Sequence, residues 1–435
     1  MTTSEKKHIP WRTVWVLTIS SNISWGSIYY AFSVLQIPMQ QELGWTKVAL
    51  TGAQSFGLVI SALTIVPVGY WIDRKGGRVV MGLGSLLAAA MLYAWSDIHT
   101  LPMYYVLFGG MGLVMSMVLY DAAFSVINAV CEASAHTAIV IVTLGGGMAS
   151  TVFYPLTQYL IDILSWRQGL VVLALLNLGV CFPLHVFGLP RHSAESHLPP
   201  PAQAKAVPGE QAVSGIRDAL SSPIFWLVAV AFTASTLILS AMATHLIPLL
   251  LEKGLTTDKA VLVAAMVGPM QVFGRLLQLF RGRWFTPERF GTLIFALFPM
   301  ALSILVVASS GSILLFAFSM LYGVANGMIT ILRGTTIPAM FGRKNYGRLN
   351  GLLAAPNLLA RAVGPIAASL IWVAADGYGL LLWCFIAIGA TATIVYWWAV
   401  VDNDNGDTST ARVDSPENLP SPAVNSPRAI QGADG

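Results

Sequence analysis

Gly69-Tyr70-Trp71-Ile72-Asp73-Arg74-Lys75-Gly76-Gly77-Arg78 is a short charged stretch between two long apolar runs. Four of its ten residues are charged, whereas only 10% of the whole chain is. Gly69 has no side chain, so it lets neighbouring helices approach closely. Asp73 can cap a helix end and pair with a basic partner. Arg74 and Arg78 are expected to hold the stretch at one face of a membrane.

The rest of the chain is apolar enough to need lipid as its solvent. Of its 435 residues, 56% are hydrophobic, and a soluble protein of that composition could not cover its surface. A membrane-spanning helix needs about 20 mostly apolar residues. Twelve runs meet this requirement: Val14–Gln36, Val48–Trp71, Val79–Trp95, Met103–Ile127, Thr137–Ile163, Leu170–Leu189, Phe225–Leu251, Ala260–Phe280, Thr292–Ala308, Ile313–Ile337, Leu349–Val373 and Leu380–Val400.

The order of these runs predicts an all-α membrane protein with twelve transmembrane helices in two six-helix, pseudo-symmetric bundles. Residues 1–189 form the first half and residues 223–401 the second. Residues 190–222 are polar and contain three consecutive prolines, which indicates a cytoplasmic linker. Residues 402–435 are rich in Asp, Asn, Ser, Pro and Gly, which is typical of a disordered tail.

Loop charges predict the orientation of the chain. With a cytoplasmic N-terminus, the inner segments hold 17 Lys and Arg residues and the outer loops hold four. Positive loops stay in the cytoplasm, so both termini are expected there. The chain is therefore expected to be a multi-pass protein of a bacterial inner (plasma) membrane.

The Gly69–Arg78 stretch resembles the Gly-x-x-x-Asp-Arg-x-Gly-x-Arg motif of the major facilitator superfamily, whose members are transporters. The halves also echo each other: Phe108–Gly112 and Tyr322–Gly327 open the fourth and tenth runs. The resemblance implies that Gly69, Asp73, Arg74 and Arg78 form a gate between conformations. The matching loop of the second half, Arg281–Phe285, lacks the acidic residue.

Other pieces resemble the monocarboxylate-transporter-like branch, which includes oxalate/formate antiporters. They are Glu42–Thr46, Ser165–Arg167, Thr244–Pro248 and Phe273–Arg275. The basic cluster of that branch is missing at Cys131–His136, so its substrate does not transfer with the resemblance. Oxalate-transporting relatives have a basic residue in the eighth and the eleventh span, as this chain does.

Arg275 in the eighth run and Arg361 in the eleventh are charges inside the membrane. Such charges are costly and usually face a cavity. Two guanidinium groups from facing helices can bind a carboxylate bidentately, so both are candidate substrate-binding residues. The alternative is that each binds backbone carbonyls and only holds helices together.

Three further polar residues lie within the runs. Asp121 is a candidate proton carrier, since a buried carboxylate binds protons more readily. The alternative is an Asp121–Arg333 bridge that closes the cytoplasmic side, which makes Arg333 a candidate gating residue. His245 is a candidate proton relay, or an interfacial hydrogen-bonding residue.

The first run is unusually polar and aromatic. Trp25, Tyr29 and Ser33 are spaced by four and share one face of an α-helix. Together with Gln54 and Tyr154, Trp25 and Tyr29 are candidate substrate-binding residues that stack on a planar solute. The alternative is ordinary helix packing and interfacial anchoring.

No phosphate-binding loop, metal-ligand spacing or catalytic triad is apparent, so we expect no enzyme activity, cofactor or metal. The three cysteines are interpreted as packing residues. We expect a monomeric secondary transporter in the lipid bilayer that binds a small molecule and no nucleic acid. Its substrate is expected to be a small organic anion taken up by symport with protons. The alternatives are uptake of a planar vitamin such as riboflavin, export of drugs or metabolites, and a receptor that does not transport.

Overall fold

The computed structural model describes residues 10–131, 134–191, 221–280, 287–341 and 346–413. These residues form helices and short connections. The first half contains α1 (Trp11–Ser24), η1 (Trp25–Tyr30), α2 (Ala31–Leu43), α3 (Lys47–Lys75), α4 (Gly77–Ser96), α5 (Leu101–Val118), α6 (Tyr120–Val130), α7 (Ala135–Gly147), α8 (Ala149–Ile163), α9 (Trp166–Leu176), η3 (Asn177–Cys181) and η4 (Leu184–Gly188). The second contains α11 (Pro223–Glu252), α12 (Thr257–Ala265), α13 (Val267–Phe280), α14 (Pro287–Val307), α15 (Leu314–Phe341), α16 (Tyr346–Ala375) and α17 (Gly379–Val413).

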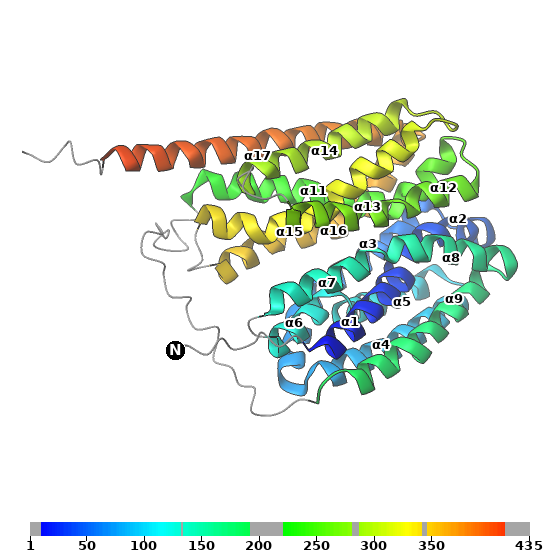
Figure 1. Ribbon diagram of the computed structural model, residues 1–435. Helices are drawn as coiled ribbons and strands as arrows, with labels where there is room; N and C mark the ends of the chain where they lie inside the picture. The colour runs from blue at the N-terminus through cyan, green and yellow to red at the C-terminus, as the bar shows by residue number, and fades with distance from the viewer. Residues whose placement is uncertain (1–9, 132–133, 192–220, 281–286, 342–345, 414–435) are drawn as a thin grey trace, which may run out of the picture.

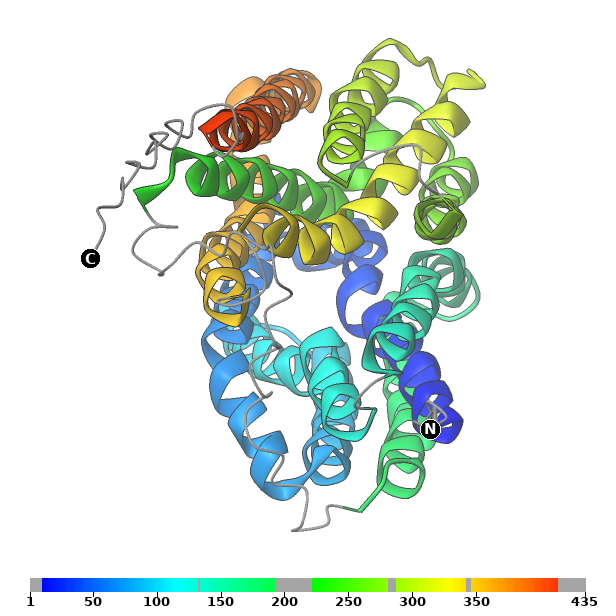
Figure 2. The same cartoon turned by 60° about the vertical axis from the view of Figure 1, so that its left-hand side comes forward.

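The twelve predicted membrane crossings are confirmed. Eleven stretches of the described helices are long and apolar enough to cross a membrane. The remaining crossing is the first, where the π-helical turn η1 separates α1 from α2 and leaves pieces of 14, 6 and 13 residues. Figures 1 and 2 show the two bundles, blue to teal for the first half and green to orange for the second.

The last helix runs further than the sequence predicts. α17 continues to Val413, so the first part of the predicted disordered tail is helical. Extending an existing helix needs no new nucleation, which lets the helix outlast its apolar run. The remainder of the tail, most of the predicted linker and Arg281–Phe285 lie outside the described residues.

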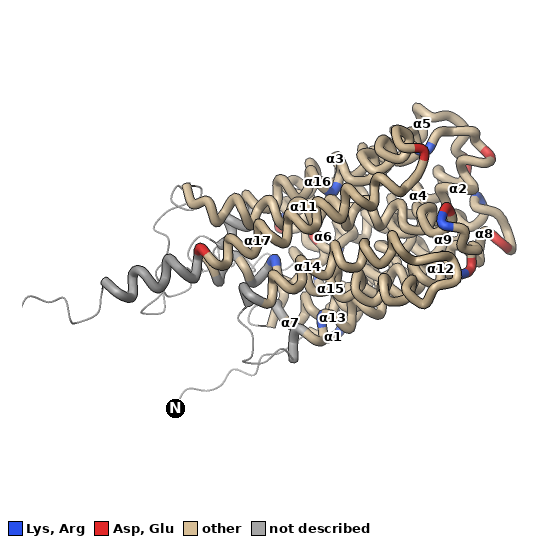
Figure 3. The backbone as a smooth tube through the Cα atoms, turned by 90° about the horizontal axis from the view of Figure 1, so that it is seen from above, with Lys and Arg blue, Asp and Glu red and all other residues tan. Residues whose placement is uncertain are grey.

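Charges gather at the two ends of the bundle (Figure 3). We call the end where α1 begins and α17 leaves the bundle the termini end. The opposite end, where α2 leads into α3, is called the closed end because hydrogen bonds join the halves there. Ser369 Oγ and Thr51 Oγ1 are 2.7 Å apart, and Ile366 N donates to Ser55 Oγ at 3.2 Å.

A polar contact also fixes the closed end of the first half. Arg167 Nε donates to Glu42 Oε1 at 2.7 Å, and Trp166 donates to the other carboxylate oxygen. Burial raises the pKa of Glu42, but these hydrogen bonds outweigh it and hold that pKa below its ordinary value. The contact ties the end of α2 to the start of α9.

The charged stretch at the termini end differs from its interpretation in two ways. Gly76 ends α3 with a φ of 82°, which favours glycine, and α4 begins after it with no side-chain cap. The prediction that Asp73 caps a helix end is therefore wrong. Gly69 does not mark a close helix contact either, because a Cβ atom there would meet nothing within 4 Å. Asp73 and Arg74 are exposed, and Arg74 lies 4.4 Å from the Tyr70 ring centroid.

The close approach lies elsewhere, where α3 crosses α5 within the first half. A Cβ atom on Gly57 would lie 2.6 Å from the carbonyl oxygen of Phe108, and one on Gly112 would meet the carbonyl oxygen of Gly57. Helices in lipid pack through such small residues, because van der Waals contact replaces the hydrophobic effect as the driving force.

This crossing gives a stability test. Gly112→Ala is expected to cost about 1–3 kcal/mol of stability, because overpacking forces the two backbones apart. The apparent Tm of the purified protein should fall. Gly69→Ala is the matched control and should not lower the Tm, because alanine fits there and is the better helix former. Equal Tm values for the two variants would contradict the packing account.

Candidate functional site

A π-helical turn in the first crossing builds the centre of the molecule. In η1, each turn holds about one residue more than an α-helix, which rotates the following side chains. Tyr30 therefore joins Trp25 and Tyr29, and the three rings contact one another with centroids 5.2 to 6.3 Å apart. The α-helical spacing of four assumed for Trp25, Tyr29 and Ser33 does not hold across this turn.

Two more tyrosines complete the set, which we call the central cluster: Trp25, Tyr29, Tyr30, Tyr120 and Tyr154. The Tyr120 ring is 5.0 Å from Trp25, and the Tyr154 ring is 5.5 Å from Tyr30. Trp25, Tyr29 and Tyr154 are buried, with at most 9% of their surface exposed. The cluster is thus a group of aromatic rings in contact, most of them packed edge to face.

A break in the fourth crossing positions Tyr120. α5 ends at Val118, Leu119 has extended backbone angles, and α6 begins at Tyr120. The Tyr120 hydroxyl donates to the carbonyl oxygen of Thr143 at 3.3 Å. The break turns this ring inward, and nothing in the apolar pattern of the crossing signals it.

Arg361 in α16 faces the cluster. Its guanidinium carbon lies 5.1 Å from the Trp25 ring centroid and 5.5 Å from that of Tyr29, which is cation–π geometry. Within the described chain, the Arg361 side chain has no hydrogen-bond acceptor and no acidic partner. The buried Trp25 Nε1 likewise has no acceptor there. Two adjacent donor groups therefore point to an acceptor that the described residues do not provide.

The backbone of Arg361 is held by the neighbouring helix. Pro365 has no N–H to donate to the Arg361 carbonyl one turn earlier. Ser240 Oγ of α11 donates to that carbonyl instead, at 2.5 Å. The Pro365 carbonyl in turn accepts from His245 Nε2 at 2.9 Å. Side chains of α11 thus satisfy the backbone of α16 around its proline.

Arg275 in α13 has the opposite environment. It is only 2% exposed, its Nη1 donates to the Thr143 carbonyl, and its Nε donates to the Gly327 carbonyl at 3.4 Å. Thr143 belongs to the first half and Gly327 to the second. Arg275 therefore joins the halves through backbone carbonyls, which is the structural alternative considered for it above.

The remaining predicted binding residues lie toward the closed end. Thr244 Oγ1 donates to Gln54 Oε1 at 2.9 Å, and the Tyr154 hydroxyl donates to the Ala243 carbonyl at 3.3 Å. Both contacts join the halves through adjacent residues of α11. They seal the central cluster on the side of the closed end.

The predicted proton and gating residues are not brought together. Asp121 is exposed in the first turn of α6, where a helix dipole favours a carboxylate, and it makes no ion pair with a described residue. Arg333 is half-buried in α15. His245 is fully buried at the closed end, with hydrogen bonds at both ring nitrogens.

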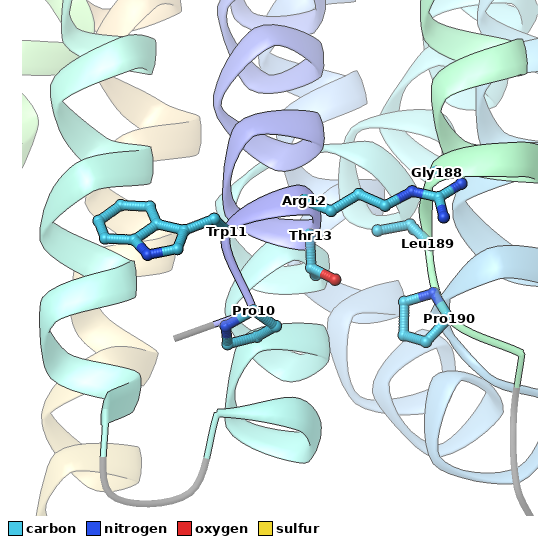
Figure 4. Close-up of a pocket in the computed structure, with 7 residues that line it drawn as sticks. All are labelled: Pro10, Trp11, Arg12, Thr13, Gly188, Leu189 and Pro190. Atoms are coloured by element: carbon cyan, nitrogen blue, oxygen red, sulfur yellow. The ribbon is translucent and has the colours of Figure 1, made fainter. Parts of the chain in front are cut away.

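A pocket of about 500 Å³ lies at the termini end, between the start of α1 and the end of η4. Figure 4 shows Trp11, Arg12 and Pro190 among its lining residues. Arg12 Nη2 donates to the Phe187 carbonyl at 2.6 Å. The pocket is shallow and shares no residue with the central cluster. In the described parts of the chain, no group of three His, Cys, Asp or Glu side chains gathers as a metal site.

The chain is similar to transporters along most of its length. The family model described as Major Facilitator Superfamily matches residues 15–290. The "Uncharacterized MFS-type transporter YcxA" of Bacillus subtilis (strain 168) is 22% identical over 397 residues, which cover 88% of this chain and 93% of that protein.

Solved structures share the fold. A bacterial homologue of the human lysosomal transporter Spinster, in an inward-facing and occupied conformation, has a TM-score of 0.64 at 15% identity over 94% of this chain and 100% of that one. The nucleoside transporter NupG, solved as a mutant, has a TM-score of 0.69 at 13% identity over 89% of this chain and 98% of that one.

The contacts of Arg275 make a stability prediction. Arg275→Met removes the bridge between the halves and takes a charged donor away from the Thr143 and Gly327 carbonyls. A hydrogen bond to a charged group contributes about 1.5–3 kcal/mol. The Tm of the protein without substrate should fall clearly. Arg361→Met, which breaks no side-chain hydrogen bond to a described residue, is the matched control and should change that Tm little. A Tm loss confined to Arg361→Met would contradict this assignment.

Proposed function

We propose that this chain, which belongs to the major facilitator superfamily, carries a small organic anion with a planar face by alternating access. Members of this family are membrane transporters and not enzymes. The anion accounts for the charge at the centre, and the planar face accounts for the rings around it.

One observation carries the choice of substrate. The Arg361 guanidinium lies against Trp25 and Tyr29 without an acceptor, and the Trp25 indole N–H beside it has none either. A carboxylate supplies acceptors for both donors and balances the positive charge of the half-buried Arg361. Arg275 stands behind the cluster, where its charge adds to the attraction without needing direct contact.

The aromatic rings favour a flat substrate over a compact one. Tyr29, Tyr30 and Tyr120 surround Trp25 within 6.3 Å, and such faces stack on a planar group. The same rings support a second candidate, a planar vitamin of the flavin type. In that case Arg361 would donate to carbonyl or hydroxyl oxygens instead of a carboxylate.

We propose proton symport as the driving force and uptake across a bacterial inner membrane as the direction. The loop charges support a cytoplasmic termini end, so the closed end faces outward. His245 has the geometry of a coupling group: it is buried and bound to the helix that carries Arg361. Asp121 is exposed and belongs to the other half, so we assign it to helix stability and not to coupling.

The substrate proposal is tested by ligand-induced thermal stabilisation. Purified protein is screened against aromatic and aliphatic carboxylates, matched neutral amides and flavins. We expect an aromatic carboxylate to raise the Tm and its amide not to do so. Arg361→Ala should weaken binding by roughly 10- to 100-fold, since a hydrogen bond to a charged group contributes about 1.5–3 kcal/mol.

Trp25→Phe separates the contribution of the aromatic ring from that of the indole N–H, since it keeps a stacking face and removes the N–H. It should weaken carboxylate binding less than Arg361→Ala does. Arg12→Ala, at the remote pocket, is the control and should bind normally. Stabilisation by neutral flavins and by none of the carboxylates would replace the anion with the second candidate.

The coupling assignment has its own test. Asp121→Asn is expected to retain accumulation driven by a pH gradient in proteoliposomes, because an exposed carboxylate in the first helical turn has no need to bind a proton during transport. Substrate accumulation is measured with and without the gradient. Accumulation that becomes insensitive to the gradient would make Asp121 the carrier instead.

A further inference from the structure

Lys47 is a charged residue that the closed end buries between the two halves. It begins α3 in the first half and is only 9% exposed. Its Nζ lies 3.3 Å from the Trp372 ring centroid and 4.6 Å from that of Tyr378, and it donates to the Tyr378 hydroxyl at 3.3 Å. Both rings belong to the second half. A lysine of one half is therefore held by an aromatic site of the other.

Glu252 holds this aromatic site in shape. Its Oε2 accepts from Trp372 Nε1 at 2.6 Å, and its Oε1 accepts from the Tyr378 amide at 2.8 Å. The carboxylate also attracts the Lys47 ammonium electrostatically. We call Trp372, Tyr378 and Glu252 the ammonium box. Two ring faces and one carboxylate are the groups that recognise an alkylammonium ion.

The box continues into a directed chain of hydrogen bonds. His245 Nε2 faces the Pro365 carbonyl, which only accepts, so Nε2 carries the ring proton. His245 Nδ1 must then accept from the Tyr378 hydroxyl, 2.9 Å away. The Tyr378 oxygen is left to accept from Lys47. The chain runs from Lys47 through Tyr378 to His245, and it requires a neutral imidazole.

Protonation of His245 is incompatible with this order of donors and acceptors. A proton on Nδ1 takes the place of the one that Tyr378 donates, so the hydrogen of the Tyr378 hydroxyl must turn away from His245. The imidazolium also adds a positive charge behind the ring that Lys47 occupies. The charged and titratable groups around His245 are Lys47 from α3, Tyr378 before α17 and Glu252 on its own helix. Glu252 is already engaged by both walls of the box.

The same helix connects the box to the centre. Trp372 and Ser369 lie on α16, as do Pro365 and Arg361. Ser369 Oγ is 3.3 Å from His245 Nε2 and 2.7 Å from Thr51 of the first half. A change at His245 therefore acts on the part of α16 that leads to Arg361.

We propose that Lys47 in the ammonium box is the latch of the closed end, and that protonation of His245 from the outer side of the membrane releases it. The proposal rests on the proposed alternating access and specifies how one of its two gates is controlled. Because the occupant of the box is an alkylammonium group on a tether, the free box binds small alkylammonium ions when Lys47 is removed.

The latch is tested with a reporter that is hidden only while the closed end is shut. Val34 of α2 is 4% exposed and packs in the apolar core of the second half. Val34→Cys is labelled with a polar thiol reagent, and modification at position 34 is followed by mass spectrometry. Adding Lys47→Ala should raise the labelling rate by about tenfold or more, the range of a desolvated cation–π contact.

Lys253→Ala is the matched control, because among the described residues this nearby lysine binds only the Val306 carbonyl. It should leave the labelling rate unchanged. Ethylamine added to the Lys47→Ala protein should refill the box and slow labelling again, which a misfolded variant would not show. Equal rates for the two lysine variants, or no slowing by ethylamine, would overturn the latch.

The role of His245 is tested by the pH dependence of the same labelling. The reactive thiolate introduced by Val34→Cys becomes scarcer as the pH falls, so the labelling rates of the His245 protein and of His245→Gln are compared at each pH. His245→Gln keeps hydrogen-bonding groups but cannot take the proton, so the ratio of the His245 rate to the Gln rate should rise as the pH falls from about 8 to about 5. A ratio that stays constant over that range would overturn the release step.

These outcomes are separate from those of the proposed function. Labelling at position 34 reports only the closed end and needs no substrate. If carboxylates still stabilise the protein while the latch variants behave like the control, the latch fails and the substrate proposal stands. If the latch variants respond as expected but no anion binds, the substrate proposal fails alone.

Discussion

Backbone hydrogen bonding in lipid is the constraint on which this structure depends. An unpaired N–H or C=O group in hydrocarbon is costly, so a crossing helix can be irregular only where other helices cover it. Three irregular points of this chain illustrate that rule. The π turn at Trp25–Tyr30, the break at Leu119 and the proline at Pro365 all lie where the halves meet or near it. Four of the five residues of the central cluster lie at the first two of these points.

The relation between the centre and the closed end follows from one proline. Pro365 leaves the carbonyl of Arg361 without its backbone donor, and the Ser240 hydroxyl donates to that carbonyl instead. His245, little more than one turn further along α11, takes the carbonyl of Pro365 itself. Where side chains of one helix bind the backbone carbonyls of another, the first helix restrains the position of the second. In this chain α11 has that control over α16, and α16 carries both a central arginine and a wall of the ammonium box.

The sequence predicted the fold better than the site, for physical reasons. Apolar runs and loop charges are properties of single segments, so the twelve crossings could be read directly. Tyr30 and Tyr120 were not among the predicted residues, because a π turn and an extended residue changed the direction of their side chains. Lys47 was counted as an ordinary loop charge. Its partner Tyr378 is 331 residues away, and no local pattern could indicate that contact.

The π turn also has a consequence for how such a protein diverges. A π-helical turn differs from an α-helical one by a single residue. Deleting one residue between Trp25 and Tyr30 would restore α-helical turns there and leave α1 and α2 packed as they are. The rings of the π turn would then point in other directions, so the set of rings facing Arg361 would change. A one-codon deletion would therefore regroup the central cluster in a way that no point substitution reproduces.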